Sequence, residues 1–291
     1  MKLFDLHCDT LYEMYKKQEG FLSNTCHISL DKAGDFEEYT QVMAIWSEHS
    51  LDGEAAYLQY KRILDYSKKI MPDNCPDFRS ILAVEGGELI CGDVNRIDKL
   101  YEDGVRIFTP VWKDVNRIGG AFNTGDGITA FGKEVIERCF DVGITVDLSH
   151  ASDELFYDVL RLAEKRGKPV IASHSCSREV FFHKRNLTDD MARAISSTGG
   201  IIGVNLVDVH LGEASVSRFA EHVRHLVDVA GEDAVCMGCD LDGTDILPDG
   251  IENLSSLPLI YDFLCDNIYD SVLSDKIFYA NAQNFFGGWI N

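Results

Sequence analysis

The sequence predicts an α/β fold, a (β/α)8 barrel of the TIM type with a metal site at the carboxyl-terminal face of its strands. Eight short apolar runs recur along the chain, and amphipathic helical segments lie between them. Five potential metal ligands stand at or near the carboxyl ends of these runs. Alternation of strand and helix predicts a parallel sheet, and eight repeats predict its closure into a barrel.

The eight predicted strands are apolar, partly β-branched runs, namely Leu3–His7, Gln41–Trp46, Ser80–Val84, Val105–Trp112, Ile144–His150, Pro169–His174, Ile201–Val207 and Val235–Leu241. Most of them are too uniformly apolar for a sheet that has one face in water. They are typical of a parallel sheet that is covered on both faces.

The predicted helices carry apolar residues at helical spacing and recognisable ends. For Asp153–Arg166 the N-cap is Ser152, the helix stops at Gly167, and Pro169 follows. The other helices are expected at Glu54–Ile70, Lys133–Asp141, Thr188–Ser197 and Val216–Ala230, with one more that starts near Ser256 and has Pro258 in its first turn.

An open, doubly wound sheet is the alternative, but no G-x-G-x-x-G or P-loop follows the first strand. No Pro-, Gly- or Ser-rich linker divides the chain, so we expect one domain over residues 1–291. The longest irregular stretches are Gly20–Asp35 and Asp114–Thr129. Long loops at the top face of a barrel often cover the site.

The composition of the chain disfavours several classes of binding partner. The net charge is −21, from 48 acidic against 27 basic residues, which disfavours binding to nucleic acid or to anionic membrane surfaces. No apolar run has spanning length, and Met1 leads almost directly into the first strand, which leaves no room for a signal peptide. Together with nine cysteines, an odd number, this predicts a cytoplasmic protein.

His7 and Asp9 stand two residues apart on the first apolar run. In a strand both side chains would point the same way and could reach one metal ion. The alternative is a core histidine beside a capping aspartate. Glu85 ends the third run, where a buried carboxylate needs a cation, either a shared pair of metal ions or an arginine.

His150 and His174 each end a predicted strand, and each follows a serine. Their strands are consecutive and therefore expected to be neighbours. Two imidazoles at one level of adjacent strands suit a zinc-type ion. The alternative is a pair of polar residues that cap helices.

Asp240 and Asp242 close the last predicted strand, in GCDLDG. One inward carboxylate beside a metal-bound water would serve as a general base. A loop-capping aspartate is the alternative, and Asp242 before Gly243 fits it well. Arg185, in the loop after His174, could clamp a substrate carboxylate, although a surface arginine is the ordinary interpretation.

The remaining histidines are weaker candidates. His222 lies on the apolar stripe of its predicted helix, so we expect it to be packed in the core. His27, His49 and His225 are interpreted as surface or loop residues, and His183 and His210 as weak pocket candidates.

The order of these motifs and their amino-acid sequences resemble the membrane dipeptidase (renal dipeptidase) family of zinc peptidases, within the metal-dependent amidohydrolase superfamily. The matching segments are DLHCD, AVEGG, GVRIFTPVW, FGKEVIERCFDVGITVDLSHAS, PVIASHS, HKRN, AISSTGGIIGVN and GCDLDG. They follow the family order over nearly the whole chain, which makes the resemblance specific.

The resemblance implies the (β/α)8 barrel of the superfamily and two zinc ions per chain. One zinc ion would be held by His7, Asp9 and Glu85. The second would be held by Glu85, His150 and His174, so that Glu85 bridges the two ions.

The resemblance also implies the reaction, in which a hydroxide between the two metals attacks the peptide carbonyl of a dipeptide. Asp240 would take the proton of the hydroxide and return it to the leaving amine. Arg185 would bind the terminal carboxylate of the substrate. Family substrates include dipeptides with a D-residue at the C-terminal position.

One position departs from the family. Its animal members carry a histidine after the fourth strand that helps to hold the developing oxyanion, and GVRIFTPVW puts Trp112 there. An indole N–H donates one hydrogen bond but carries no charge near neutral pH. Trp112 is therefore expected at the substrate, and it leaves the substrate class open.

The resemblance thus implies a zinc-dependent dipeptidase with a small dipeptide as its partner. A related dinuclear amidohydrolase that acts on another amide or on a lactone is the first alternative, and a non-catalytic metal-binding barrel is the second. Homodimers are common in the family, but the sequence carries no interface signal. The lipid-anchor and secretion signals of eukaryotic members are not recognised here, which indicates a soluble, bacterial-type form.

Overall fold

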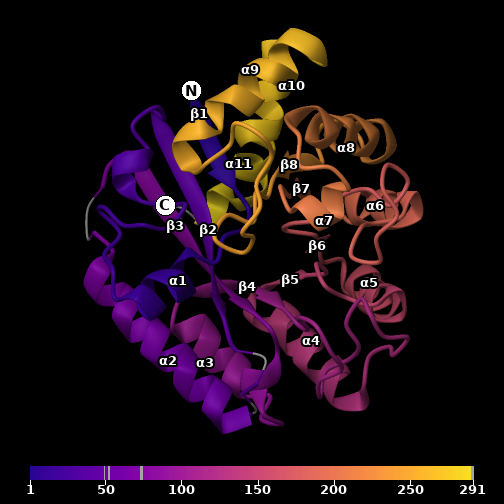
Figure 1. The fold of residues 1–291 in the computed structure, drawn as a ribbon. Coiled ribbons are helices and arrows are strands. Elements are labelled where there is room, and N and C mark those ends of the chain that lie inside the picture. The colour runs from indigo at the N-terminus through magenta and orange to yellow at the C-terminus, as the bar shows by residue number, and fades with distance from the viewer. Residues whose placement is uncertain (49, 52, 73–74, 290–291) are drawn as a thin grey trace.

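A computed structural model describes residues 1–48, 50–51, 53–72 and 75–289, and an eight-stranded parallel sheet lies at its centre (Figure 1). The strands follow the order β6-β5-β4-β3-β2-β1-β8-β7. Their bounds are Lys2–Asp5 (β1), Glu38–Trp46 (β2), Phe78–Glu85 (β3), Val105–Thr109 (β4), Thr145–Asp147 (β5), Val170–Ile171 (β6), Ile202–Val204 (β7) and Val235–Met237 (β8).

The two ends of this strand order meet, so the sheet closes into a barrel. A parallel bridge joins Ala172, just after β6, to Ile202 in β7. The backbones approach so closely here that a Cβ on Gly203 would lie 2.0 Å from the carbonyl oxygen of Ser173. The predicted (β/α)8 barrel is therefore confirmed, and its closing seam requires a residue without a side chain.

Helices cover the outside of the barrel. They are α1 (Thr10–Lys17), α2 (Gly53–Ile70), α3 (Arg96–Glu102), α4 (Ala130–Val142), α5 (Asp153–Arg166), α6 (Asp189–Ser197), α7 (Asp208–Leu211), α8 (Val216–Ala230), α9 (Pro258–Asn267), α10 (Ser271–Asp275) and α11 (Asn281–Phe286). Single turns occur at Leu30–Lys32, Glu88–Ile90, Leu254–Ser256 and Gly287–Trp289, and a π-helical turn at Lys276–Ala280.

The helices predicted from the sequence lie where they were expected, within a few residues at their ends. In α5 the Ser152 hydroxyl accepts from the Leu155 N–H, and Gly167 takes the left-handed conformation that ends the helix. The sequence did not predict α1, α3, α7, α10 or α11. These helices have 8, 7, 4, 5 and 6 residues, too short for a strong periodic signal.

Two apolar layers build the core, because side chains along a strand alternate between the two faces of the sheet. In β2, Val42 and Ala44 belong to the cluster inside the barrel, and Met43 and Ile45 belong to the cluster beneath the helices. Ala282 and Phe286 of α11 join the inner cluster. Asn281 of the same helix donates to the carbonyl of Val235, where β8 begins, so α11 closes the amino-terminal end of the barrel.

Several strands end earlier than predicted. The run Ile144–His150 contains only the three strand residues of β5, and the run up to His174 contains only the two of β6. The carboxylate of Asp147 explains both ends, because it accepts hydrogen bonds from the N–H groups of Ser149 and Ser173 and so takes them out of the strand ladder. Both histidines therefore lie in turns just beyond their strands.

The prediction that His7 and Asp9 lie in a strand is wrong. Strand β1 ends at Asp5, and Asp9 is the N-cap of α1. The carbonyl of Asp9 already accepts from the N–H groups of Tyr12 and Glu13, so the chain turns into the helix at this residue. The two side chains still come close, but the start of the helix brings them together rather than the alternation of a strand.

The structure leaves some predictions open. All nine cysteines are free thiols, and no described helix is both long and apolar enough to cross a membrane. The single domain over residues 1–291 stays a prediction. His49, expected in a loop, lies outside the described residues.

His222 is packed in the core, as predicted from its helix stripe, and it is fully buried. Its Nδ1 accepts from the Ser177 N–H at 3.0 Å, and its Nε2 lies 3.2 Å from the carbonyl oxygen of Leu211. Nε2 therefore carries the single ring proton. Burial lowers the pKa of His222 from 6.5 to about 4.

We expect His222 to make the protein less stable as pH falls. In the unfolded chain this imidazole takes up a proton near pH 6.5, whereas in the folded protein it does so only near pH 4. The neutral ring therefore contributes fully to the unfolding free energy above pH 6.5, and this contribution is lost as pH falls from 6.5 to 4. When pH falls from about 7.5 to about 5, the unfolding free energy of the wild type should drop by roughly 2 kcal/mol more than that of His222→Gln. Urea unfolding at several pH values measures this, and parallel pH dependences would contradict it.

Candidate metal centre and active site

Six histidine and carboxylate side chains converge at the carboxyl-terminal mouth of the barrel. Each lies at the end of a strand or within a few residues after it. His7 and Asp9 follow β1, Glu85 ends β3, His150 follows β5, His174 follows β6 and Asp240 follows β8. All the parallel strands end at this face, so residues more than 200 positions apart in the sequence become neighbours.

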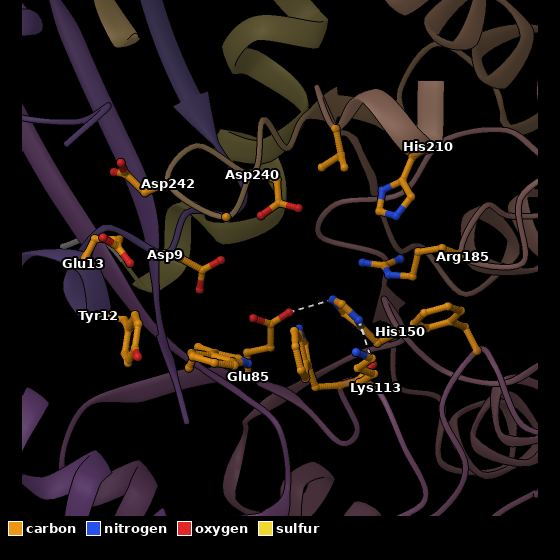
Figure 2. Close-up of a pocket in the computed structure, with 15 residues that line it drawn as sticks. Asp9, Tyr12, Glu13, Glu85, Lys113, His150, Arg185, His210, Asp240 and Asp242 are labelled. Carbon is orange, nitrogen blue, oxygen red and sulfur yellow. Dashed lines mark hydrogen bonds and ion pairs between the residues drawn. The ribbon is translucent and has the colours of Figure 1, made fainter. Parts of the chain in front are cut away.

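Four of these side chains border a cavity of about 360 Å³, and they are Asp9, Glu85, His150 and Asp240. Figure 2 shows Arg185 and His210 on one side of the cavity and Glu13, Tyr12 and Asp242 on the other. The remaining labelled carboxylates lie between these two sides, and they are Asp9, Glu85 and Asp240. The cavity thus has the Arg185 guanidinium at one side and acidic groups through its middle and at its other side.

Glu85 stands at the centre of the cluster and is only 2% exposed. Its Oε2 lies 3.7 Å from His7 Nε2. Its Oε1 lies 2.8 Å from His150 Nε2 and 3.5 Å from His174 Nε2. The two oxygens of one carboxylate therefore face different histidines, and the alternative of an arginine salt bridge is not found among the described residues.

His7 connects Glu85 to the other two carboxylates. Its Nε2 lies 3.8 Å from Asp9 Oδ2 and 3.8 Å from Asp240 Oδ1. Two sets of potential ligand atoms within 4.8 Å of one another result, namely His7, Glu85 and His174, and His7, Asp9 and Asp240.

Hydrogen bonds fix which nitrogen of His150 and His174 carries a proton. His150 Nδ1 lies 2.9 Å from the carbonyl oxygen of Trp112, which can only accept. His174 Nδ1 lies 2.7 Å from Ser173 Oγ, whose own proton goes to Asp147 at 2.6 Å. Both rings therefore carry the proton on Nδ1, and both Nε2 lone pairs point at the cluster, 2.9 Å apart.

Electrostatics give the cluster a shortage of positive charge. Burial holds the pKa values of His150 and His174 well below the ordinary range, so both rings are neutral. Burial and the nearby Asp9 raise the pKa of Glu85 well above its ordinary value. Burial would lower the pKa of His7, but the carboxylates of Glu85 and Asp9 outweigh it and raise this pKa to about 10.

The residues present fit divalent metal ions. His7 Nε2 and Asp9 Oδ1 are buried without a hydrogen-bond partner, although buried polar atoms are normally paired. Two imidazole lone pairs that face each other repel unless a cation lies near both. Imidazole nitrogens and carboxylate oxygens are ligands that zinc takes. A Cβ on Gly243 would lie 2.5 Å from Asp9 Oδ2, so this position must be small for the carboxylates to stay accessible.

The two aspartates after β8 have different surroundings. Burial raises the pKa of Asp240 to about 6. The backbone does not distinguish the two residues, because both are left-handed, with φ of 62° at Asp240 and 67° at Asp242. Such a conformation in a residue other than glycine is costly and is often found at functional sites. Asp242 instead accepts hydrogen bonds from the Thr10 hydroxyl and the His27 N–H, at 2.5 and 2.6 Å. It therefore ties loops together, as its position before Gly243 suggested.

Arg185 is buried, with 4% of its surface exposed, and it lines the cavity. Its two Nη atoms donate to the Ser175 hydroxyl and the His174 carbonyl, both at 3.1 Å. Its Nε has no partner, and no ion pair with a carboxylate is found in the described part of the chain. The interpretation as a surface arginine is wrong. A buried guanidinium without a carboxylate partner is costly, so an anion bound beside it would stabilise it.

An aromatic wall completes the cavity. Trp46 lies between Tyr12 and Trp112, with ring centroids 4.8 and 5.0 Å apart, and Phe122 lies 6.3 Å from the His150 ring. Trp112 lines the cavity as expected, and its carbonyl also orients His150. The wall gives the cavity an apolar surface in addition to its charged groups.

Sequence reasoning missed the residues that support the site. Asp147, Ser173 and Asn205 are buried and hydrogen-bonded to the candidate histidine ligands or to the turns that carry them. Asp147 was visible as a polar residue inside the apolar run ITVDLSH, a signal that a buried polar network is present. His210, a weak candidate before, lines the cavity, whereas His183 is not among its lining residues.

Known proteins resemble this chain in sequence and in structure. A family model described as membrane dipeptidase (peptidase family M19) matches residues 63–287. Dipeptidase 3 of Mus musculus is 30% identical over 228 residues, which cover 74% of this chain but 45% of the mouse protein, so the match spans about half of that relative.

Two solved structures share the fold over nearly their whole length. A dipeptidase described as a metallopeptidase of family M19 has a TM-score of 0.89 and 25% identity, covering 98% of this chain and 97% of its own. A metallopeptidase from Rhodobacter sphaeroides, liganded with a phosphinate mimic of the dipeptide L-Ala-D-Ala, has a TM-score of 0.88 and 24% identity, covering 99% of each chain. This chain therefore belongs to peptidase family M19, the membrane dipeptidases, which are metallopeptidases.

Proposed function

We propose that this protein is a zinc-dependent dipeptidase that hydrolyses the peptide bond of dipeptides, including those with a D-residue at the C-terminal position. The observation that carries the proposal is Glu85, whose two carboxylate oxygens face different histidines. Family membership supports the reaction class. The L-Ala-D-Ala mimic bound to the Rhodobacter sphaeroides relative supports the stereochemistry.

Five side chains would hold two zinc ions. His7, Asp9 and Glu85 would bind the first, and Glu85, His150 and His174 the second, so that Glu85 bridges them. When bound, the ions would polarise the scissile carbonyl and lower the pKa of a water molecule. The hydrogen bonds that leave the Nε2 lone pairs of His150 and His174 free support this ligand set.

Asp240 would move the proton. One of its carboxylate oxygens would accept the proton of the attacking water, and the same oxygen would deliver it to the nitrogen of the leaving amine. A carboxylate whose pKa is raised to about 6 is a better base than an ordinary aspartate, and it still releases its proton readily near neutral pH. Its Oδ1 lies 3.8 Å from His7 Nε2, beside the proposed ligands.

Arg185 would hold the terminal carboxylate of the dipeptide. The guanidinium is buried, and its Nε has no partner among the described residues. Two parallel N–H bonds to a carboxylate would fix the direction of a short substrate and bring its amide over the middle of the cavity. The cavity of about 360 Å³ suits a molecule of dipeptide size.

Trp112 motivates a second candidate, an amidohydrolase that acts on another amide or on a lactone. Trp112 and Trp46 form a T-shaped pair in the cavity wall, which would contact apolar parts of a substrate. An indole offers no positive charge to a developing oxyanion, so the substrate that fits here need not be that of the animal enzymes.

We expect zinc-loaded protein to hydrolyse members of a panel of L,L- and L,D-dipeptides, and metal analysis to find about two zinc ions per chain. Chelation should abolish the activity, because the polarisation of the carbonyl is lost. Turnover of N-acyl amino acids or lactones instead of dipeptides would favour the second candidate. A correctly folded protein free of metal would contradict the zinc site, and inactivity on the whole panel with zinc bound would indicate a binding barrel.

Asp240→Asn should lower kcat for dipeptides by at least about 100-fold, because it removes the proton carrier. Its zinc content should stay at the wild-type level. The matched control is Asp245→Asn, in the exposed part of the same loop, which should keep wild-type kcat. Near-normal turnover by Asp240→Asn would exclude Asp240 as the proton carrier.

Ser173→Ala should weaken zinc binding by about 10-fold to 100-fold, because it removes the acceptor that orients His174 Nδ1. Competition with a chromophoric chelator measures the affinity. Ser197→Ala, on the exposed surface of α6, is the control. An unchanged zinc affinity in Ser173→Ala would show that His174 needs no support from Ser173.

A further inference from the structure

We propose that His210 donates a second hydrogen bond to the terminal carboxylate of the substrate, beside Arg185, and so helps the enzyme to select free dipeptides. This inference rests on the proposed function. His210 belongs to α7, the short helix that follows β7, and it lines the cavity. Figure 2 shows its ring directed toward the Arg185 guanidinium, on the side of the cavity away from Glu13 and Asp242.

Asn205 determines where the proton of His210 lies. The Val207 N–H donates to Asn205 Oδ1 at 3.2 Å, which identifies the oxygen of this amide. Asn205 Nδ2 then donates to the His174 carbonyl at 3.0 Å and to His210 Nδ1 at 3.1 Å. Because Nδ1 accepts this bond, the ring proton of His210 lies on Nε2.

The backbone holds this ring in place, and its Nε2–H is left for a ligand. The His210 carbonyl accepts from Asn186 Nδ2 at 2.8 Å, and its N–H donates to the Val207 carbonyl at 3.0 Å. No hydrogen bond of Nε2 is found within the described residues. Burial and the nearby Arg185 keep the pKa of His210 low, at about 2, so the ring is a neutral donor.

Two donors without an acceptor therefore stand at one side of the cavity. Arg185 brings a full positive charge and an unpartnered Nε–H, and His210 brings a neutral N–H from a different element. A carboxylate has two oxygens with about four acceptor positions, so it can take bonds from both residues. A carboxamide would direct its NH₂ group at one of the donors and leave that donor unpaired.

This arrangement predicts selection by chain length. A tripeptide, or a dipeptide amide, has an uncharged amide where a dipeptide has its carboxylate. A site whose buried donors are built for one acceptor rejects a ligand that lacks it, often by large factors. His210 and Arg185 together would thus restrict hydrolysis to substrates with a free carboxylate one residue beyond the scissile bond.

The test compares kcat and KM for the best dipeptide of the panel and for the amide of the same dipeptide. His210→Phe keeps a ring of similar size but removes the donor, and it should raise KM for the dipeptide roughly 10-fold or more with little change in kcat. KM for the amide should stay within about twofold, because the bond is not made there. His210→Gln, which restores an N–H near Nε2, should recover most of the loss.

Controls separate this binding role from a structural one. His225→Phe, on α8 and bonded to Asp189, should leave the kinetics for both substrates at wild-type values. Zinc content and melting temperature of the His210 variants show whether they are folded. Equal losses for dipeptide and amide, no loss for either, or no recovery in folded His210→Gln would each overturn the proposal.

Failure of the proposed function would look different. In that case the wild-type protein itself hydrolyses no dipeptide, whatever residue 210 is. The role of His210 is then read from calorimetric binding of the L-Ala-D-Ala dipeptide and of its amide to the zinc-loaded wild type and to His210→Phe. A preference for the free carboxylate that disappears in His210→Phe supports the proposal, and no such change overturns it.

Discussion

The buried carboxylate of Glu85 is the constraint on which the rest of the mouth depends. A carboxylate at the end of an apolar strand is costly to bury unless cations or donors surround it. Within the described residues its ion-pair partners are three histidines, of which two are held neutral, and two further carboxylates lie nearby. The cluster therefore lacks positive charge, which bound metal ions would supply. A glutamate directly after the apolar residues Ala83 and Val84 is therefore a signal for a metal centre, in agreement with a family of metallopeptidases.

The barrel fixes the positions of the side chains around Glu85. Asp147 accepts backbone N–H groups after two neighbouring strands, ends both strands at the same level, and orients His174 through the Ser173 hydroxyl. Trp112 orients His150 through its carbonyl in the same way. The residues that would touch metal are thus set by a buried layer of hydrogen bonds beneath them. Such a layer is rigid because each of its members is paired, and a break in it leaves buried polar groups without partners.

The charges in the cavity give a substrate its direction. Arg185 and His210 offer donors at one side, and the carboxylates of Glu13 and Asp242 lie on the other side (Figure 2). A dipeptide carries a carboxylate at one end and an amine at the other, so it has one favourable orientation in such a field. The Trp46–Trp112 pair adds apolar contact, which accepts many side chains. On the proposed function, charge would orient the dipeptide, and the aromatic wall would contact its side chains.

The sequence by itself determined the barrel, most of its helices and the residues that meet at its mouth. Apolar runs at regular spacing carry that information locally, and each of His7, Asp9, Glu85, His150, His174 and Asp240 stands at or just after the end of such a run. Short helices such as α1 and α3 carry too little periodic signal, and the strand ends were misplaced because the side chain of Asp147 competes with the ladder. Only the tertiary structure decided that Arg185 is buried rather than exposed at the surface. The same holds for the proton of His210, which Asn205 fixes. These properties depend on hydrogen bonds between side chains that are far apart in the sequence, and no local pattern records such bonds.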